Sequence, residues 1–390
     1  MQIPVTTPAP TPTEDAFPQI LCSRKSLVDL AIFSDDKARA LSFYFDLSTF
    51  SDTSHREESV DLEQLVDHAR SSVPAEDGAG ALQKDLDMIL SMESDIRKAP
   101  RVFRAAFACG SQGVRQILSL PYASNIRMLK VGRNFEVVPL VRALEACTPY
   151  GVVLAEAGKA RAFVGQGDDI HEVMHRFAPV DIGVHADDSR VGWSHHIDAN
   201  VEERRKAFLR SLAAEVQQFA IDKAFQHLVI GCREDLWSQL EPEFARIGLV
   251  AGHAHLKSYD ATPYEVLQMA KPAFLAMQQQ AYAEFWKEVN EAPTRSAVGI
   301  ERVLQSLEEG RVRKLFLGTV PEGETRECAL CGKWQPTALS ACYACKSTDL
   351  RTIPFGELMV RKALLSDAEI LAPESGQQIE DHTVGALLRY

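Results

Sequence analysis

Apolar positions along the chain recur with two different periods. Residues 58–71 and 80–98 carry apolar residues three and four positions apart, which predicts two amphipathic helices. Further along, 101–110, 114–120 and 126–132 are short apolar segments that predict strands. A helix is expected over 137–147. The first third of the chain is therefore predicted to mix helices with a sheet.

A second block begins at residue 151. Two strands joined at Ala157-Gly158-Lys159 are expected first, followed by a third strand over 172–180. A loop from about 183 to 197 precedes a long predicted helix, 199–225. The apolar segment 227–232 predicts a buried central strand, and a helix over 233–248 ends at Gly248. We expect an α/β sandwich of about 110 residues, close to the size of a typical domain.

A third block begins at Pro263, which opens a predicted helix running through Trp286. The other elements expected here are a helix at 298–310, a strand at 312–318, a helix at 355–365 and strands at 368–373 and 384–390. Alternating helices and strands are typical of the α/β class.

The domain organisation follows from these blocks. Residues 1–20 contain five prolines and are expected to form a flexible tail. An N-terminal α/β domain is expected over 21–147, a middle domain over 148–262 and a C-terminal domain over 263–390. The chain is thus predicted to have three domains, in agreement with its length of 390 residues.

Composition narrows the classes of function. Hydrophobic residues make up 46% of the chain and charged residues 25%, as in ordinary globular proteins. No run of about 18 apolar residues predicts a membrane span, and the N-terminus has no signal-peptide pattern, so a cytoplasmic location is expected. The net charge of −12 has the wrong sign for a protein that coats nucleic acid. Any RNA binding must therefore depend on a local patch.

Four of the eight cysteines form a doubled motif. Cys328 and Cys331 make one C-x-x-C pair, and Cys342 and Cys345 make another. Two such knuckles provide the four thiolates of a structural zinc site, with no ligand position open for a substrate. Gly332 suits the left-handed turn that a knuckle requires. We expect a zinc ribbon over 326–350; two disulfides or a redox dithiol are the alternatives.

Conventional catalytic motifs are missing. Residues 318–324 resemble a phosphate loop, but Glu324 stands where lysine is required. His253 and His255 alternate without a carboxylate at ligand spacing, so a surface or packing role is favoured. The other cysteines, among them Cys109, Cys147 and Cys232, are expected to be reduced, and these three buried.

One polar segment stands out in this acidic chain. Residues 189–208 combine Trp193 with a cluster of cationic and histidine side chains. Arginine, histidine and an aromatic ring at a loop tip are suited to phosphate contact and base stacking in RNA. The alternative is a solvated helix start whose charges pair with Glu202 and Glu203.

The order of these segments resembles the bacterial branch of the archaeal and eukaryotic class-one release factor and Pelota superfamily. Four features carry the resemblance over residues 150–390: the strand pair of 151–163, the loop and helix of 191–209, the run 298–318 and the terminal 385–390. It implies an RNase H-like middle domain and a kink-turn-protein-like C-terminal domain with an inserted zinc ribbon.

The chain departs from the family pattern at the loop that release factors use for hydrolysis. Release factors of this superfamily position water for ester hydrolysis with a Gly-Gly-Gln loop, whereas Val191, Gly192 and His195 stand at the corresponding places here. The resemblance implies a loop near the peptidyl transferase centre that binds rRNA without catalysis. Its expected residues are Arg190, Gly192, Trp193, Ser194, His195, His196, Arg204 and Arg205.

The implied function is occupation of the ribosomal A site in hibernation or protection of idle ribosomes. The implied partners are the rRNA of both subunits and elongation factor Tu or another translational GTPase. Peptidyl-tRNA hydrolysis, with His195 in place of the glutamine, is the enzymatic alternative. A nuclease would need an acidic cluster, for which only Glu156 and Asp181 are candidates.

Overall fold

The structure is a computed structural model of the 390-residue chain. It describes residues 22–45, 55–71, 79–92, 102–122, 124, 126–156, 159–173, 194–223, 225–319, 323–336, 338–374 and 384–390, but not the side chains of 55–61, 79, 194–202 and 204. The chain divides into two compact units. We call 148–279 the middle unit, and 20–147 together with 280–390 the composite unit.

The first part of the composite unit is a four-stranded antiparallel sheet with helices. Its elements are α1 (Arg24–Ile32), β1 (Ala40–Phe45), α2 (His55–Ser71), α3 (Ala79–Ser91), β2 (Phe103–Cys109), η1 (Gly110–Gln112), β3 (Val114–Leu120), β4 (Arg127–Gly132) and α5 (Val138–Ala146). The strand order is β3-β2-β1-β4.

Strand β1 is buried on both faces, which explains why all of its residues except Ser42 are apolar or aromatic. Leu41, Phe43 and Phe45 belong to a core with residues of α2 and α3. Ala40 and Tyr44 alternate with them and belong to a second core, which contains residues of α5, α9 and α10. One face of the N-terminal sheet therefore packs against the C-terminal part of the chain.

The second part of the composite unit contains two further sheets. Its elements are η2 (Pro293–Arg295), β10 (Ser296–Val298), α9 (Ile300–Glu308), β11 (Val312–Leu317), β12 (Glu324–Cys328), β13 (Trp334–Gln335), β14 (Leu350–Pro354), α10 (Phe355–Leu365), β15 (Glu369–Leu371) and β16 (Val384–Leu388). The larger sheet has the order β10-β16-β11-β15, with β11 and β15 parallel. Strands β13, β12 and β14 form a small antiparallel sheet, inserted between β11 and α10.

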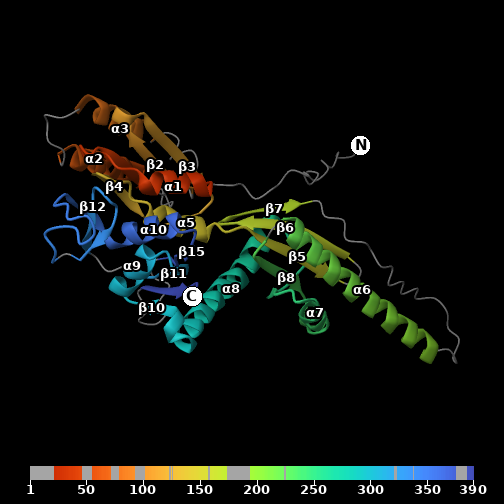
Figure 1. The fold of residues 1–390 in the computed structure, drawn as a ribbon. Helices are drawn as coiled ribbons and strands as arrows, with labels where there is room; N and C mark the ends of the chain where they lie inside the picture. Colours follow the sequence, from red (N-terminus) through yellow and green to blue (C-terminus); the bar gives the residue numbers. More distant parts are fainter. Residues whose placement is uncertain are drawn as a thin grey trace, which may run out of the picture. The chain divides into compact units, whose positions relative to one another are not determined.

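The middle unit is a five-stranded mixed sheet with helices on both faces (Figure 1). Its elements are β5 (Tyr150–Glu156), β6 (Lys159–Gln166), β7 (Asp169–Val173), α6 (Ser194–Asp222), β8 (His227–Cys232), α7 (Glu234–Ile247), β9 (Gly252–His255) and the first part of α8 (Pro263–Glu291). The order is β7-β6-β5-β8-β9: three antiparallel strands, then two strands parallel to β5. This is the sheet of an RNase H-like domain.

Alternation along β5 explains the two layers of helices. Val153 and Ala155 lie in a core with residues of α6 and α7, whereas Val152 and Leu154 lie in a core with residues of α8. Both layers of the sandwich thus depend on one apolar strand.

The expected mixed α/β class is confirmed, with differences at element ends. Helix α6 begins at Ser194, so the prediction that the loop extends to residue 197 is wrong. The third strand of the middle sheet is Asp169–Val173 rather than 172–180, and residues 174–180 lie outside the described part. The sequence patterns indicate neither helix α1 nor strand β1. None of the helices in the described ranges has the length and apolar character of a membrane span.

Candidate metal centre and loop-bearing helix

The four cysteines of the doubled motif come together at one end of the small inserted sheet. Cys328 is the last residue of β12, and all four Sγ atoms lie within 4.8 Å of one another. Two of the distances are 3.5 Å, from Cys328 Sγ to Cys345 Sγ, and 3.6 Å, from Cys331 Sγ to Cys342 Sγ. In a tetrahedral tetrathiolate site with zinc–sulfur bonds of about 2.3 Å, neighbouring sulfurs lie about 3.8 Å apart. The cluster is therefore compatible with a single metal ion.

The two knuckles have the same backbone geometry. The N–H of Gly332 donates to the carbonyl of Cys328 at 2.9 Å, and the N–H of Lys346 donates to the carbonyl of Cys342 at 3.0 Å. Both residues follow the second cysteine of their pair and have left-handed φ angles, 68° for Gly332 and 63° for Lys346. The left-handed turn expected at Gly332 is confirmed. The sequence does not indicate its counterpart at Lys346, because a lysine in that conformation is strained and gives no signal.

Gln335 supports the cysteine cluster, a role that the sequence pattern does not reveal. Its fully buried side-chain amide donates to Cys342 Sγ at 3.2 Å and to the carbonyl of Lys333 at 3.1 Å. Its amide oxygen accepts the N–H of Tyr343 at 2.9 Å. Groups that hydrogen-bond to metal ligands hold them in orientation. A polar residue between the two cysteine pairs is the only signal for this role in the sequence.

A carboxylate outside the small sheet anchors it to the rest of the composite unit. Glu308, at the end of α9, accepts the N–H of Trp334 at 3.0 Å and pairs with Lys333 at 3.2 Å and Lys362 at 2.6 Å. Burial opposes ionisation of Glu308, but these three donors together lower its pKa. On α10, the residue next to Lys362, Arg361, also pairs with a glutamate of β12. The inserted sheet is therefore fastened to two helices by charged contacts.

The structure divides the residues expected in the rRNA-binding loop. Arg190, Gly192 and Trp193 lie outside the described residues. Ser194, His195 and His196 form the start of α6, where only the backbone is described, and the side chain of Arg204 is not described.

Arg205 is the one residue of this set whose side chain is described, and it is half-buried on α6. The alternative to RNA contact is that the cationic side chains of this segment pair with Glu202 and Glu203. The side chain of Glu202 lies outside the described part, and Arg205 forms no ion pair with the exposed Glu203 in the structure. The pairing of Arg205 with Glu203 is therefore not observed, and a pairing with Glu202 lies outside the described part.

The described side chains in the N-terminal part of helix α6, before Phe208, do not belong to the apolar core of the middle unit. Among its described side chains, Glu203, Lys206 and Ala207 are exposed, and Phe208 is the first that is buried. At 1.5 Å per residue, the segment from Ser194 to Ala207 is about 21 Å long. In Figure 1 the first turns of α6 run beyond the edge of the sheet. We call this segment the α6 arm; the chain of the expected loop joins its start.

Three of the other cysteines and His253 have packing roles. Cys109, Cys147 and Cys232 are buried, as expected. The His253 ring stacks on Trp237 with centroids 4.8 Å apart, and its Nε2 lies 3.0 Å from the carbonyl oxygen of Cys232.

The acidic cluster that a nuclease would need is not formed by Glu156 with other described residues. Glu156 pairs with Lys159 at 3.0 Å, and Asp181 lies outside the described residues. Among the described residues, the four cysteines are the only group of histidine, cysteine or acidic side chains positioned to hold a metal.

Comparison with known proteins finds a family match for one segment of the chain. Residues 136–274 match the model of bacterial archaeo-eukaryotic release factor family 10. This segment contains the whole mixed sheet of the middle unit and helix α6. No curated protein sequence is similar enough to be identified as a relative.

Two solved structures align with most of the chain, and a third aligns with part of it. The Archaeoglobus fulgidus Pelota is 13% identical, over 96% of this chain and 93% of that one, with a TM-score of 0.34. The S. cerevisiae Dom34, a translation termination-like factor interacting with Hbs1, is 10% identical, over 96% and 94%, with a TM-score of 0.35. The C-terminal domain of a Methanosarcina mazei peptide chain release factor is 27% identical, over 30% of this chain and 83% of that one, with a TM-score of 0.22.

These superpositions are too loose to transfer residue roles. The family match covers residues 136–274, and this segment is similar to bacterial archaeo-eukaryotic release factor family 10.

Proposed function

We propose that the protein binds the vacant A site of the bacterial ribosome and occupies it without catalysing a reaction, which would protect idle ribosomes. The observation that carries the proposal is the α6 arm within the family-matched segment 136–274. A rigid helix extending beyond the core is suited to carry a loop into a deep RNA site. Protein partners on a flat surface would not require such reach.

The residues at the start of this arm argue against hydrolysis. Catalysis by the Gly-Gly-Gln loop depends on backbone conformations open to glycine and on an amide that positions water. Val191 restricts the backbone, and His195 replaces the amide by an imidazole of different shape. Occupation of the site requires neither property, so the loss of both favours a binding role.

Local chemistry, rather than total charge, would produce the affinity for rRNA. The net charge of −12 opposes approach to a polyanion. Arg190, Trp193 and His196 would supply phosphate contacts and a stacking surface at the loop, and Arg204 and Arg205 would contact phosphates along the arm. The composite unit would contact the ribosome elsewhere and a translational GTPase, with elongation factor Tu as the partner that the family resemblance suggests.

The cysteine cluster would hold one structural zinc ion. Four thiolates form a closed donor set that zinc binds tetrahedrally, and no position is left for water or substrate. Bound zinc would rigidify the inserted sheet, which is too small to bury a core of its own. A rigid ribbon would then present a contact surface to the ribosome or the GTPase.

Co-sedimentation with purified ribosomes tests the proposal. The protein should pellet with vacant ribosomes, and a tRNA in the A site should displace it. A triple variant, Arg190→Gln, Trp193→Ala and Arg205→Gln, should weaken the association at least tenfold. Arg210→Gln and His255→Ala are matched controls, since both change exposed residues of the middle unit outside the proposed contact. Failure to pellet with ribosomes in any nucleotide or tRNA state would exclude the proposal.

A release assay separates occupation from hydrolysis. Ribosomes that carry peptidyl-tRNA and a vacant A site are incubated with the protein, and free peptide is measured. No release above background is expected. Release that is lost in His195→Ala but kept in His255→Ala would replace the proposed role by peptidyl-tRNA hydrolysis.

A further inference from the structure

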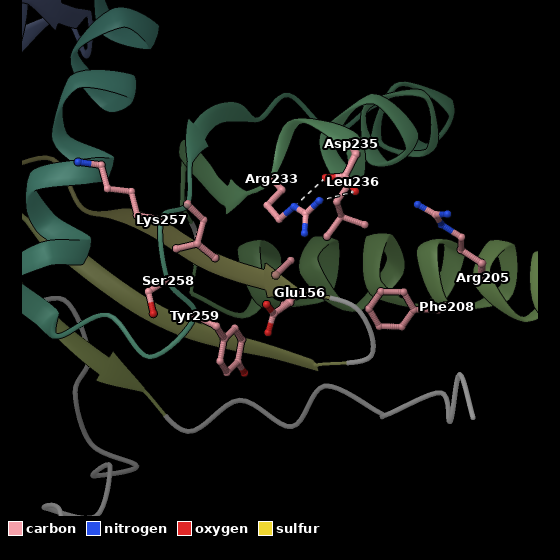
Figure 2. A pocket seen from close by; sticks show the side chains of 11 residues that line it. Glu156, Arg205, Phe208, Arg233, Asp235, Leu236, Lys257, Ser258 and Tyr259 are labelled. Carbon is pink, nitrogen blue, oxygen red and sulfur yellow. Dashed lines mark hydrogen bonds and ion pairs between the residues drawn. The ribbon is translucent and has the colours of Figure 1, made fainter. Parts of the chain in front are cut away.

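A cavity of about 320 Å³ lies in the middle unit (Figure 2). It opens where β5, β8 and β9 end, and these three strands are parallel to one another. Ligands of open α/β sheets bind at the carboxyl ends of parallel strands. The volume is within the range of small-molecule sites.

The cavity has an apolar floor with one aromatic ring on each side. Ala155, Leu236 and Leu256 line it, and Phe208 and Tyr259 contribute the rings. In Figure 2, Phe208 comes from α6 and Tyr259 from the segment after β9. A planar, apolar body such as a nucleobase can stack against such rings.

The wall that carries Tyr259 is held rigidly. Arg161 on β6 donates to the carbonyl of Tyr259 at 2.7 Å and to that of Ala261 at 3.1 Å. The same guanidinium forms two hydrogen bonds with Glu172, at 2.8 Å and 2.6 Å. Lys159 lies 4.1 Å from the centroid of the Tyr259 ring. The site therefore requires little ordering when a ligand binds, which favours affinity.

Three cationic residues, Arg205, Arg233 and Lys257, and two acidic residues, Glu156 and Asp235, line the cavity. Its two acids already have partners, because Glu156 pairs with Lys159 and Asp235 pairs with Arg233. Arg205 also lines the cavity and has no ion-pair partner among the described residues.

Two arginines line the cavity. Figure 2 shows the guanidinium groups of Arg205 and Arg233 on the same side, while the ammonium of Lys257 points away. Guanidinium groups donate paired hydrogen bonds whose geometry matches the oxygens of a phosphate. This side of the cavity is therefore suited to a phosphate group.

We propose that this cavity binds a single nucleotide, with the phosphate on Arg205 and Arg233 and the base between Phe208 and Tyr259. The nucleotide is either a free ribonucleoside monophosphate or an unstacked residue of an RNA strand. The binding step itself does not require a ribosome. Only the RNA source rests on the proposed function.

Titration calorimetry on the full chain, without ribosomes, tests the site. The probes are the four ribonucleoside 5′-monophosphates, the matching nucleosides and inorganic phosphate. At least one monophosphate should bind at least tenfold more tightly than its nucleoside and than phosphate alone. Absence of binding at millimolar monophosphate, or equal binding of nucleoside and monophosphate, would overturn the inference.

Matched arginine variants locate the site. Arg205→Gln and Arg233→Gln should each reduce affinity for the monophosphate at least tenfold. Arg210→Gln on α6 and Arg246→Gln on α7 remove the same charge at positions that do not line the cavity, and should change affinity less than twofold. Equal losses in all four variants would indicate charge attraction alone and contradict a built site. The arginines concerned are exposed or half-buried, so the variants should fold, which thermal melting checks.

Co-sedimentation of the Arg233→Gln variant with ribosomes distinguishes a free nucleotide from an unstacked nucleotide of RNA as the ligand of the cavity. Weaker ribosome association together with weaker nucleotide binding supports an RNA nucleotide. Unchanged ribosome association with lost nucleotide binding supports a free nucleotide. Lack of nucleotide binding in a protein that still pellets with ribosomes would reject the cavity proposal and leave the proposed function intact.

Discussion

The side-chain carboxyl group of Glu357, on α10, accepts the backbone N–H of Val137 at 2.7 Å. It also accepts the N–H of Val138 at 3.0 Å, so a residue of the C-terminal part of the chain caps the start of α5. Val137 itself offers no side-chain cap. The N-terminal sheet and the C-terminal sheet are thus joined by a buried pair of hydrogen bonds as well as by their shared apolar core.

Replacement of this carboxyl group should destabilise the whole composite unit. Glu357→Ala leaves two helix N–H groups without an acceptor, and we expect a loss of about 2–4 kcal/mol in the free energy of unfolding. Urea unfolding followed by circular dichroism measures it. Glu301→Ala, on the exposed face of α9, is the control and should change stability little. Equal effects of the two substitutions would contradict the capping role.

Glu357 should also give the stability a pH dependence. Burial, with a smaller effect from Glu136, raises its pKa from 4.5 to about 8. Because the folded state then binds more protons than the unfolded state between pH 4.5 and 8, stability should fall as the pH rises through this window. Unfolding curves recorded from about pH 5 to about pH 9 measure the slope. In Glu357→Gln the slope should be reduced; a slope unchanged in this variant would assign it to other groups.

Glu308 should give the stability a pH dependence of the opposite sign, in a lower pH range. Its pKa is lowered by Lys362, Trp334 and Lys333 despite burial, so its contribution is present above the unfolded value of 4.5 and is lost as the pH falls through the folded pKa. Glu308→Gln should therefore remove part of the acid sensitivity below pH 4.5 and cost about 1–3 kcal/mol near neutral pH. Acid titration of the tryptophan fluorescence checks this. Glu309→Gln, at the next and more exposed position, should keep the wild-type profile.

The left-handed residue of the second knuckle is a site for stabilisation. Lys346→Gly should raise the free energy of unfolding by about 1 kcal/mol, because glycine adopts a positive φ without strain. Lys346→Ala removes the same charge and keeps the strain, so it should give no such gain. Gly332→Ala should cost about 1 kcal/mol for conformational reasons alone, since an added Cβ would meet no atom within 4 Å. Thermal melts of the metal-loaded protein compare the three.

Replacement of Gln335 should weaken the affinity for zinc without changing the number of zinc ions bound per chain. Gln335→Leu removes the N–H donor to Cys342 Sγ, and we expect an affinity for zinc about 10- to 100-fold weaker, still with one ion per chain. Competition with a chromophoric chelator measures the affinity. Gln305→Leu on α9 is the control, because that exposed side chain donates to Glu309 and lies outside the cysteine cluster. Equal zinc affinity in Gln335→Leu and the wild type would reject the supporting role.

The sequence predicts elements well where one local rule decides them. The doubled C-x-x-C motif brings four sulfurs together because its spacing alone determines two knuckles, and Gly332 marks one turn. Lys346 occupies the corresponding turn of the second knuckle in the structure. A lysine in the sequence does not indicate a left-handed φ angle, so this turn could not be predicted. Strand β1 shows no alternation of apolar and polar residues, because both of its faces are buried by segments far away in the chain.

The candidate sites depend on similar long-range effects. Arg205 belongs to a cationic cluster that is visible in the sequence, but its place in the lining of one cavity with Arg233 and Tyr259 results from the meeting of α6 with segments that follow β8 and β9. No periodicity predicts that meeting. Glu357 likewise reads as one acid in an apolar helix, and only the tertiary structure places it against α5.

The two ends of the inserted small sheet meet each other. Glu324 and Pro354 are partners in the β12–β14 ladder, and the N–H of Phe355 donates to the carbonyl of Gly323 at 3.3 Å. The small sheet itself thus closes the two ends of the insertion, immediately before α10 begins. We therefore expect the strand order β10-β16-β11-β15 to depend little on the length of the ribbon segment between β12 and β14.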